Sequence, residues 1–183
     1  MIIMTLIKKN IFLTGAPSSG KTTVIKKVIG LLDHPANGFY TEEERLDGKR
    51  VGFIMNTIDG KKGYLAHEDI RSEFHIRRYG VSIENIDNIA ASSIAPMGNN
   101  IIIVDEIGKM ECFSRVFRQA ANEALNSPNI VVGTITFGGD EFILGIKNRG
   151  DLEIHEVTAE NRDLLPAAIL QKISGLLRGQ EGR

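Results

Sequence analysis

The 183-residue sequence has no tryptophan, one cysteine and five prolines. The lone cysteine, Cys112, excludes an internal disulfide and a metal cluster built from cysteines, and we expect the reducing environment of the cytoplasm. No apolar run approaches the roughly 20 residues of a membrane-spanning helix, because Lys8, Lys9 and Asn10 interrupt the longest early one. The stretch Met1–Ile7 is too short for a signal peptide. We therefore expect no membrane partner.

The chain also lacks a marked excess of charge, since 22 basic residues face 23 acidic ones. Domains whose main partner is nucleic acid usually carry a strong positive excess, so nucleic acid is not indicated as a partner. The apolar fraction of 42% and the charged fraction of 25% are close to globular averages. The length predicts a single domain over residues 1–183.

Short apolar runs alternate with segments of helical periodicity along most of the chain. The runs predict strands, and the periodic segments predict helices. The expected strands cover 10–14, 100–105, 129–134 and 152–157, and the expected helices cover 21–32, 82–94, 114–125, 140–147 and 161–177. Such alternation is typical of a three-layer α/β fold with a mainly parallel central sheet. Ligands of such sheets bind at the carboxyl ends of the strands.

The segment near residues 38–80 has a different character. Three β-prone runs, 38–44, 50–57 and 63–67, are separated by the dipeptides Asp47-Gly48 and Asp59-Gly60. Asp-Gly between β-prone runs is a strong signal for a hairpin turn. The pattern predicts an antiparallel β-hairpin insertion and not a separate domain.

A glycine-rich loop between the first strand and the first helix matches the pattern G-x-x-x-x-G-K-[ST] in full. Its members are Gly15, Ala16, Pro17, Ser18, Ser19, Gly20, Lys21 and Thr22. The glycines permit a backbone whose amides point inward at a helix N-terminus, where they bind phosphate. We expect Lys21 to contact the β- and γ-phosphates of a nucleoside triphosphate and the Thr22 hydroxyl to ligate Mg²⁺. The loop predicts a P-loop nucleotide site.

The apolar strand later in the chain ends in two carboxylates. Its sequence is Ile101, Ile102, Ile103, Val104, Asp105, Glu106, Ile107 and Gly108. A magnesium-bound triphosphate needs one carboxylate for the shell of the metal and often another to orient the attacking water. We assign Asp105 to Mg²⁺ through a water and Glu106 to the role of general base. Glu111 is an alternative base, which we expect on the solvated side.

Residues 105–108 also fit the D-x-x-G motif of GTP switches, in which the glycine amide contacts the γ-phosphate. However, no N-K-x-D segment follows, and Lys109 stands where such switches carry a glutamine. We therefore do not interpret the chain as a GTP switch.

Phosphoryl transfer often uses an arginine finger. The candidates are Arg45, Arg50, Arg78, Arg149 and Arg162. We favour Arg149, and we expect Arg162 beside the nucleotide base. Residues 41–44 fit a solvated hairpin edge better than a place in the site.

Several of these blocks occur together in the order of a known family. They are the phosphate loop, Gly38–Arg45, Gly48–Phe53, Arg78–Val81 and Asp105–Glu111. The chain resembles the small nucleoside-triphosphatase family that includes the cancer-related nucleoside triphosphatases, over nearly its whole length. The resemblance implies hydrolysis of ATP, GTP and other NTPs. It also implies a P-loop NTPase sheet of the additional-strand type, with nucleotide-binding blocks at Gly15–Thr22 and Ile101–Gly108.

Two other functions fit the same phosphate loop. One is a kinase for a small molecule or nucleotide, with Arg45, Arg50 and Glu42 in an acceptor pocket and Asp140–Gly150 as a lid. The other is a slow NTP-dependent switch or a module associated with nucleic acid. Near-neutral charge weakens the second alternative.

The phosphate-loop assignment generates a direct test. The substitution Lys21→Ala removes the charge that faces the phosphates, so both nucleotide affinity and hydrolysis should be lost. Calorimetry with a magnesium nucleotide and a phosphate-release assay measure the two effects. Unchanged affinity in the folded variant would contradict the assignment.

Overall fold

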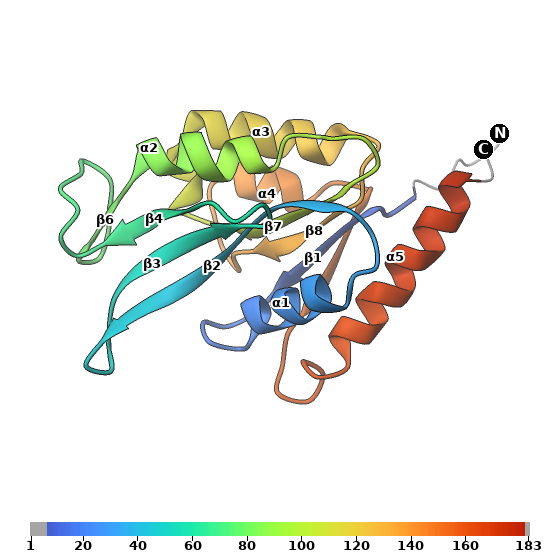
Figure 1. The fold of residues 1–183 in the computed structure, drawn as a ribbon, viewed down its shortest axis with the longest axis horizontal. Coiled ribbons are helices and arrows are strands. Elements are labelled where there is room, and N and C mark those ends of the chain that lie inside the picture. Colours follow the sequence, from blue (N-terminus) through green and yellow to red (C-terminus); the bar gives the residue numbers. More distant parts are fainter. Residues whose placement is uncertain (1–6, 182–183) are drawn as a thin grey trace.

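The computed structural model describes residues 7–181, which form an α/β fold around one nine-stranded sheet with the order β5-β6-β4-β3-β2-β7-β8-β1-β9 (Figure 1). The strands are β1 (Asn10–Thr14), β2 (Ala36–Leu46), β3 (Lys49–Thr57), β4 (Lys62–His67), β5 (His75–Ile76), β6 (Tyr79–Val81), β7 (Ile101–Ile107), β8 (Val131–Ile135) and β9 (Leu152–Glu156).

The sheet has a parallel part made of β2, β7, β8, β1 and β9. Strand β8 lies between β1, which leads into the phosphate loop, and β7, which carries Asp105 and Glu106. This interposed strand is the one that the family resemblance implies. The prediction of a mainly parallel sheet with an additional strand is therefore confirmed.

The antiparallel extension continues the same sheet without a break. Strand β2 pairs in parallel with β7 through Ala36–Phe39 and antiparallel with β3 through Phe39–Leu46. Strands β4, β6 and β5 follow in antiparallel pairs. The hairpin insertion predicted near residues 38–80 is confirmed. It is hydrogen-bonded to the parallel part through β2.

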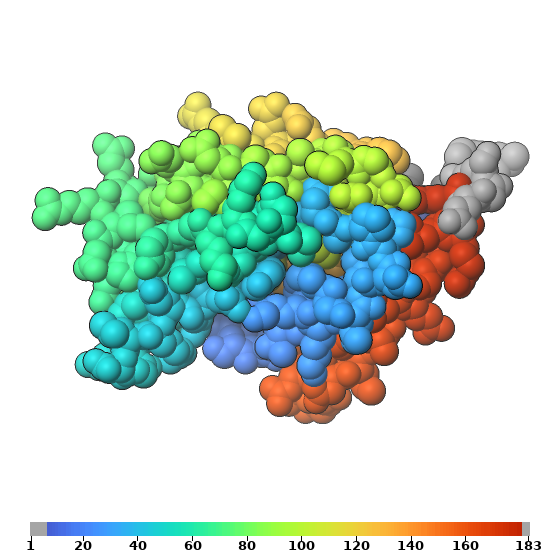
Figure 2. All heavy atoms as spheres, viewed as in Figure 1, coloured from blue at the N-terminus to red at the C-terminus, as the bar shows by residue number. Residues whose placement is uncertain are grey.

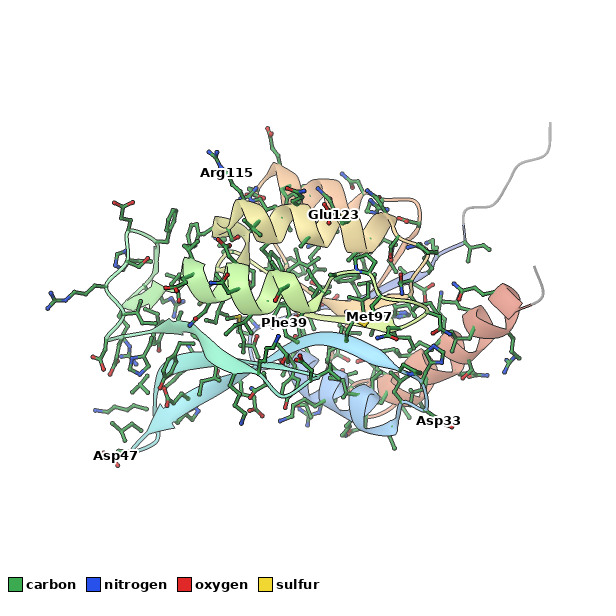
Figure 3. The ribbon with its side chains drawn as sticks, turned by 45° about the horizontal axis from the view of Figure 1, so that its top comes forward. Asp33, Phe39, Asp47, Met97, Arg115 and Glu123 are labelled. Atoms are coloured by element: carbon green, nitrogen blue, oxygen red, sulfur yellow. The ribbon has the colours of Figure 1, made fainter. Side chains whose placement is uncertain are left out.

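Helices cover both faces of the sheet (Figure 1). On one side are α1 (Lys21–Leu31) and α5 (Leu165–Glu181), and on the other are α2 (Ile83–Asn85) with the π-helical turn Ile86–Ala91, α3 (Arg115–Asn126) and α4 (Glu141–Lys147). Two hydrophobic clusters fill these interfaces. Phe39 lies between the sheet and the helices of the face covered by α2, α3 and α4, and its ring packs edge-to-face on Phe117 (Figure 3).

None of the helices in the described part of the chain has the length and apolar character that crossing a membrane requires.

Polar caps begin three of the helices. The side chains of Ser82, Ser114 and Asp140 accept hydrogen bonds from backbone N–H groups three residues later. Such caps satisfy N–H groups that have no partner within the helix.

Two expected boundaries are wrong. Helix α5 begins at Leu165 and not at residue 161, because Pro166 fits only the first turn of a helix. Asn161 instead closes the preceding turn, where its side chain accepts a hydrogen bond from the Thr158 N–H. Strand β7 does not end at Asp105 but continues to Ile107.

Close strand packing generates a stability prediction at Gly133 of β8. A Cβ there would overlap the Val104 carbonyl oxygen and lie 3.0 Å from the Phe12 ring. Gly133→Ala should therefore lower the free energy of unfolding by about 1–3 kcal/mol, as overpacking does.

The matched control is Gly145→Ala in α4, where an added Cβ meets no described atom within 4 Å. Alanine is the better helix former, so this variant should be neutral or up to about 1 kcal/mol more stable. Urea unfolding measures both, and equal effects of the two substitutions would contradict the packing argument.

Candidate functional site

The phosphate loop connects the carboxyl end of β1 to α1, as the motif predicts. Gly15 has φ of 142° and Gly20 has φ of 103°, in the region that favours glycine. A Cβ on Gly15 would also lie 2.9 Å from the Val157 carbonyl oxygen. The Lys21 ammonium donates hydrogen bonds to the carbonyl oxygens of Gly15 and Ala16, at 3.0 and 3.1 Å. These hydrogen bonds fix the Lys21 ammonium group against the start of the loop.

The carboxylate of Asp105 lies at the centre of the site and is only 2% exposed. Its Oδ1 accepts a hydrogen bond from the Thr134 hydroxyl at 2.8 Å, and its Oδ2 accepts one from the Thr41 N–H at 3.4 Å. Burial raises the pKa of Asp105, while hydrogen bonds from Thr134 and Thr22 and the charge of Lys21 oppose that rise. Strands β2, β7 and β8 and helix α1 therefore all contribute to one carboxylate.

An irregularity in β7 aims Asp105 and Glu106 at the same cavity. Val104 pairs with Gly133 and Ile107 pairs with Ile135, so three steps along β7 match two along β8. A β-bulge of this kind redirects side chains that a regular strand would send to opposite faces. Both carboxylates therefore face the cavity from within the strand.

Two lysines influence the carboxyl group of Glu106. Burial raises the pKa of Glu106, and the positive charge of Lys21 is the first influence that lowers it. The charge of Lys147, at the end of α4, also lowers it, whereas the charge of Asp105 raises it. Lys147 is anchored by a hydrogen bond from its ammonium group to the Phe137 carbonyl oxygen. Glu106 thus lies between a buried acid and two cations.

Glu111 is not on the solvated side, so that expectation is wrong. Its side chain is 4% exposed, and it lines the same cavity as Glu106. Residues 111–113 form a short helical turn that folds back toward Gly108, where Cys112 N–H donates to the Gly108 carbonyl. Burial, and then the charge of Glu106, raises the pKa of Glu111 to about 8. The group is therefore largely protonated at neutral pH.

A cavity of about 980 Å³ joins these groups. Lys21, Thr22, Asp105, Glu106 and Gly108 all line it, so the structure brings together the residues expected to act on the phosphates. The cavity continues past them toward the antiparallel extension. In Figure 2 the β2–β3 hairpin, in cyan, projects beyond the blue segment that contains the phosphate loop, with a notch between them.

The apolar members of the second nucleotide-binding block have a different place. The side chains of Ile101–Val104 and Ile107 lie in the two hydrophobic clusters and are at most 1% exposed. Within the site they serve to carry Asp105 and Glu106 to the carboxyl edge of the sheet.

Arg149 does not approach the phosphate loop, so the preference for it as an arginine finger is wrong. Its guanidinium donates to Asp151, to the Asn126 side chain and to the Leu125 carbonyl oxygen. These groups lie where α3 ends and β9 begins, at the amino edge of the parallel strands. The nearby Lys147, two residues earlier, does act on the site through its charge.

Arg162 lies beside the loop, because a Cβ on Gly20 would be 3.6 Å from its Cδ. A contact with the nucleotide base stays a prediction. Arg45, Arg50 and Arg78 lie together on the antiparallel extension, around Tyr79.

Sequence reasoning missed Thr41 and Thr134. Thr41 was expected on a solvated edge, but its hydroxyl donates to the Asp105 carbonyl oxygen at 2.8 Å. Thr134 sits at the carboxyl end of β8, next to β7. The rule that ligands bind at the carboxyl ends of parallel strands points to such a residue. No comparable signal in the sequence marks Thr41.

Thr22 and Asp105 fit a magnesium ion. Hydroxyl and carboxylate oxygens are the donors that Mg²⁺ prefers. The buried Asp105 carboxylate has polar hydrogen-bond partners but forms no ion pair within residues 7–181. A divalent cation would supply the missing positive charge, so this donor set suits one.

A family model described as NTPase matches residues 10–170. The chain belongs to this family. Nucleoside-triphosphatase THEP1 of Thermotoga sp. strain RQ2 is 42% identical over 174 residues, which cover 94% of this chain and 97% of that protein. The human cancer-related nucleoside-triphosphatase is 36% identical over 177 residues, covering 86% of this chain and 93% of the human protein. The resemblance inferred from the sequence blocks is confirmed.

Solved structures of the NTPase family agree with the fold. The crystal structure of THEP1 from Aquifex aeolicus superposes with a TM-score of 0.82 at 34% identity, covering 90% of this chain and 98% of that one. The solution structure of the human cancer-related nucleoside triphosphatase gives a TM-score of 0.76 at 34% identity, with coverages of 91% and 97%.

The buried Glu111 generates a pH prediction. Its pKa is about 8 in the folded protein against an ordinary value of 4.5. Unfolding releases a proton between these pH values, so the free energy of unfolding falls as pH rises through this window, by at most about 1.4 kcal/mol per unit. Glutamine does not titrate, so the free energy of unfolding of Glu111→Gln lacks this pH dependence. The free energy of unfolding of the variant should therefore rise relative to that of the wild type as pH increases toward 8.

Urea unfolding at pH 5, 6.5 and 8 measures the gain. Glu123→Gln is the control, since Glu123 is exposed on α3 and points away from the sheet (Figure 3). A difference between the Glu111 variant and the wild type that stays constant with pH would contradict the raised pKa.

Proposed function

We propose that this protein hydrolyses the terminal phosphoanhydride of magnesium-bound nucleoside triphosphates, among them ATP and GTP, to the diphosphate and phosphate. One observation supports the proposal most strongly. The phosphate loop, the buried Asp105 and the partly buried Glu106 line a single cavity, and Lys21 acts on the pKa of both carboxyl groups. Membership of the NTPase family supports the same reaction.

Phosphate binding is assigned to the loop. The amides of residues 15–22 lie at the N-terminus of α1, where the helix dipole favours an anion. Lys21 neutralises charge on the β- and γ-phosphates. Thr22 and Asp105 hold Mg²⁺, which when bound neutralises charge on the phosphate oxygens. Thr134 and Thr41 keep the Asp105 carboxylate in position through their hydrogen bonds.

Glu106 is assigned to the attacking water. It lines the cavity together with Lys21 and Gly108. Glu106 orients the water and accepts its proton as the bond to phosphorus forms, and the diphosphate leaves. Lys147 steadies the negative charge near this carboxylate from the α4 side.

The test of the function is phosphate release by the purified protein from ATP, GTP, CTP and UTP, with and without Mg²⁺. We expect release that requires Mg²⁺ and occurs with more than one base. The proposal fails if the folded protein releases no phosphate from any of the four.

The test of the catalytic assignment is Glu106→Gln. The amide keeps the size of the side chain but cannot accept the proton, so kcat should fall by about 10²–10⁴-fold. Nucleotide affinity should stay close to that of the wild type. Glu123→Gln is the matched surface control and should leave both unchanged. Turnover at the wild-type rate in the Glu106 variant would show that another group orients the water.

A further inference from the structure

The cavity is longer than hydrolysis by water requires. Beyond Asp105 and Glu106 it continues along β3, β4 and β6, where Phe53, Leu65, Tyr79, Ile76 and Arg77 line it. Water needs no binding pocket of its own. The far half of the cavity is therefore unexplained by the proposed hydrolysis.

A second hollow of about 460 Å³ adjoins the far end. It is lined by Arg45, Arg50, Arg77, Arg78 and Tyr79. Arg50, Arg77 and Tyr79 line both hollows, so the two meet at these side chains. The space that begins at the phosphate loop thus ends in a group of four arginines.

Two of these arginines are held in place by a single acid. Glu43 accepts hydrogen bonds from Arg50 at 2.5 Å and from Arg45 at 2.6 Å, one on each carboxylate oxygen. The Arg50 guanidinium also lies 4.8 Å from the centre of the Phe53 ring. Glu43 and Phe53 are directly opposite each other on β2 and β3. The orientation of Arg50 is therefore set before any ligand binds.

Tyr79 organises the other side of the group. It is 5% exposed, and its hydroxyl accepts a hydrogen bond from Arg78 at 3.2 Å and donates one to the Arg50 carbonyl oxygen at 3.0 Å. Its ring packs edge-to-face on Phe53, with 5.4 Å between the centroids. A buried phenol and an aromatic pair thus fix the floor of the hollow.

The positive charge of the group exceeds the negative charge that pairs with it. Glu43 pairs with Arg45 and Arg50, and Glu68 pairs with Arg78 at 3.4 Å. Within residues 7–181, no carboxylate forms an ion pair with Arg77. Four cations against two carboxylates leave a surplus of two, which matches the charge of about −2 on a phosphomonoester near neutral pH.

Arg77 is presented by a strained turn. It lies in the tight connection between β5 and β6 with φ of 56°, a region that non-glycine residues seldom occupy. The Ile76–Tyr79 pair closes this turn. The backbone therefore directs an exposed, unpaired guanidinium to the place where the two hollows meet.

We propose that the far half of the cavity binds a small phosphomonoester that accepts the γ-phosphoryl group of the nucleotide. The phosphate of this acceptor contacts Arg50 and Arg77, and its body contacts the apolar side chains of Phe53, Leu65 and Ile76. A hydroxyl of the acceptor then takes the place of the attacking water beside Glu106. This inference rests on the nucleotide site of the proposed function, but it adds a second substrate.

The transfer step balances without a further reactant. A bond forms between the acceptor oxygen and the γ-phosphorus, and the bond from that phosphorus to the β–γ bridging oxygen breaks. The hydroxyl proton passes to Glu106, and the nucleoside diphosphate leaves with the bridging oxygen. Hydrolysis is the same step with water in place of the acceptor.

The binding test uses the full chain with its nucleotide site filled by Mg²⁺ and a non-hydrolysable ATP analogue. Calorimetry then probes inorganic phosphate, ribose 5-phosphate and the nucleoside 5′-monophosphates, which cannot enter the occupied phosphate loop. We expect at least one phosphomonoester to bind with a Kd below about 1 mM, and more tightly than inorganic phosphate, because only the ester reaches the apolar wall.

The variant is Arg77→Asn, since asparagine tolerates the left-handed conformation of this turn. It should weaken binding of that phosphomonoester by about 10-fold or more, because the loss of one hydrogen bond to a charged group lowers affinity by about this factor. Arg178→Gln is the matched control. It removes an exposed arginine from α5, at the opposite end of the molecule from the β2–β3 hairpin, and should change nothing (Figure 1).

A transfer assay with ATP completes the test and needs no variant. We expect a phosphorylated product from the probe that binds. The inference is overturned if no phosphomonoester binds, if Arg77→Asn binds as tightly as the wild type, or if the bound probe is never phosphorylated. Binding of an oligonucleotide by a protein that ignores every small probe would also overturn it.

The two proposals fail in distinguishable ways. Phosphate release from ATP without any acceptor phosphorylation leaves the hydrolase proposal intact and removes the acceptor site. Phosphorylated product without release into water removes hydrolysis and leaves the acceptor site. Failure to bind any magnesium nucleotide removes both.

Discussion

The hydrogen bonds that converge on Asp105 are the constraint on which the site depends. Thr41 from β2 and Thr134 from β8 reach this one buried carboxylate on β7, so three neighbouring strands meet in a fixed register at their carboxyl ends. An ionised carboxylate at this depth is costly unless cations or donors surround it. The phosphate loop supplies Lys21 and Thr22 from the next layer. The assembly of the sheet thus fixes the position of the carboxylate to which the nucleotide and metal proposal assigns Mg²⁺.

The bulge in β7 adds a second carboxylate, Glu106, to the cavity that Asp105 lines. A regular strand would turn Glu106 away from the cavity, where it could not orient a water beside the terminal phosphate. The extra residue in β7 places both carboxylates on one cavity. The charge of Asp105 raises the pKa of Glu106, and the positive charges of Lys21 and Lys147 act against that effect. The protonation of Glu106 therefore depends on where Asp105, Lys21 and Lys147 place their charges around it.

Much of this arrangement was predictable from the sequence because it depends on local patterns. The phosphate loop is a contiguous motif, and the strand of Asp105 is a continuous apolar run, so both were located, although the end of that strand was not. The Asp-Gly turns located the hairpin insertion. What could not be predicted depends on long-range packing. The burial of Glu111 follows from a helical turn that folds back on Gly108, and the position of Arg149 follows from contacts with α3 and Asp151. The role of Thr41 required the parallel pairing of β2 with β7.

The unbroken sheet has a mechanical consequence. Enzymes that bind two substrates commonly close by rotating one rigid body against another about a flexible joint. Here the strands beneath the arginine group are joined to those beneath the phosphate loop by a continuous ladder of backbone hydrogen bonds through β2. Such a ladder resists bending, so it offers no joint for a large rotation. Selectivity between substrates must then arise from side chains and short loops that move over a rigid sheet. Because the sheet fixes the distance between the phosphate loop and the arginine group, it also limits the length of the molecules that can contact both.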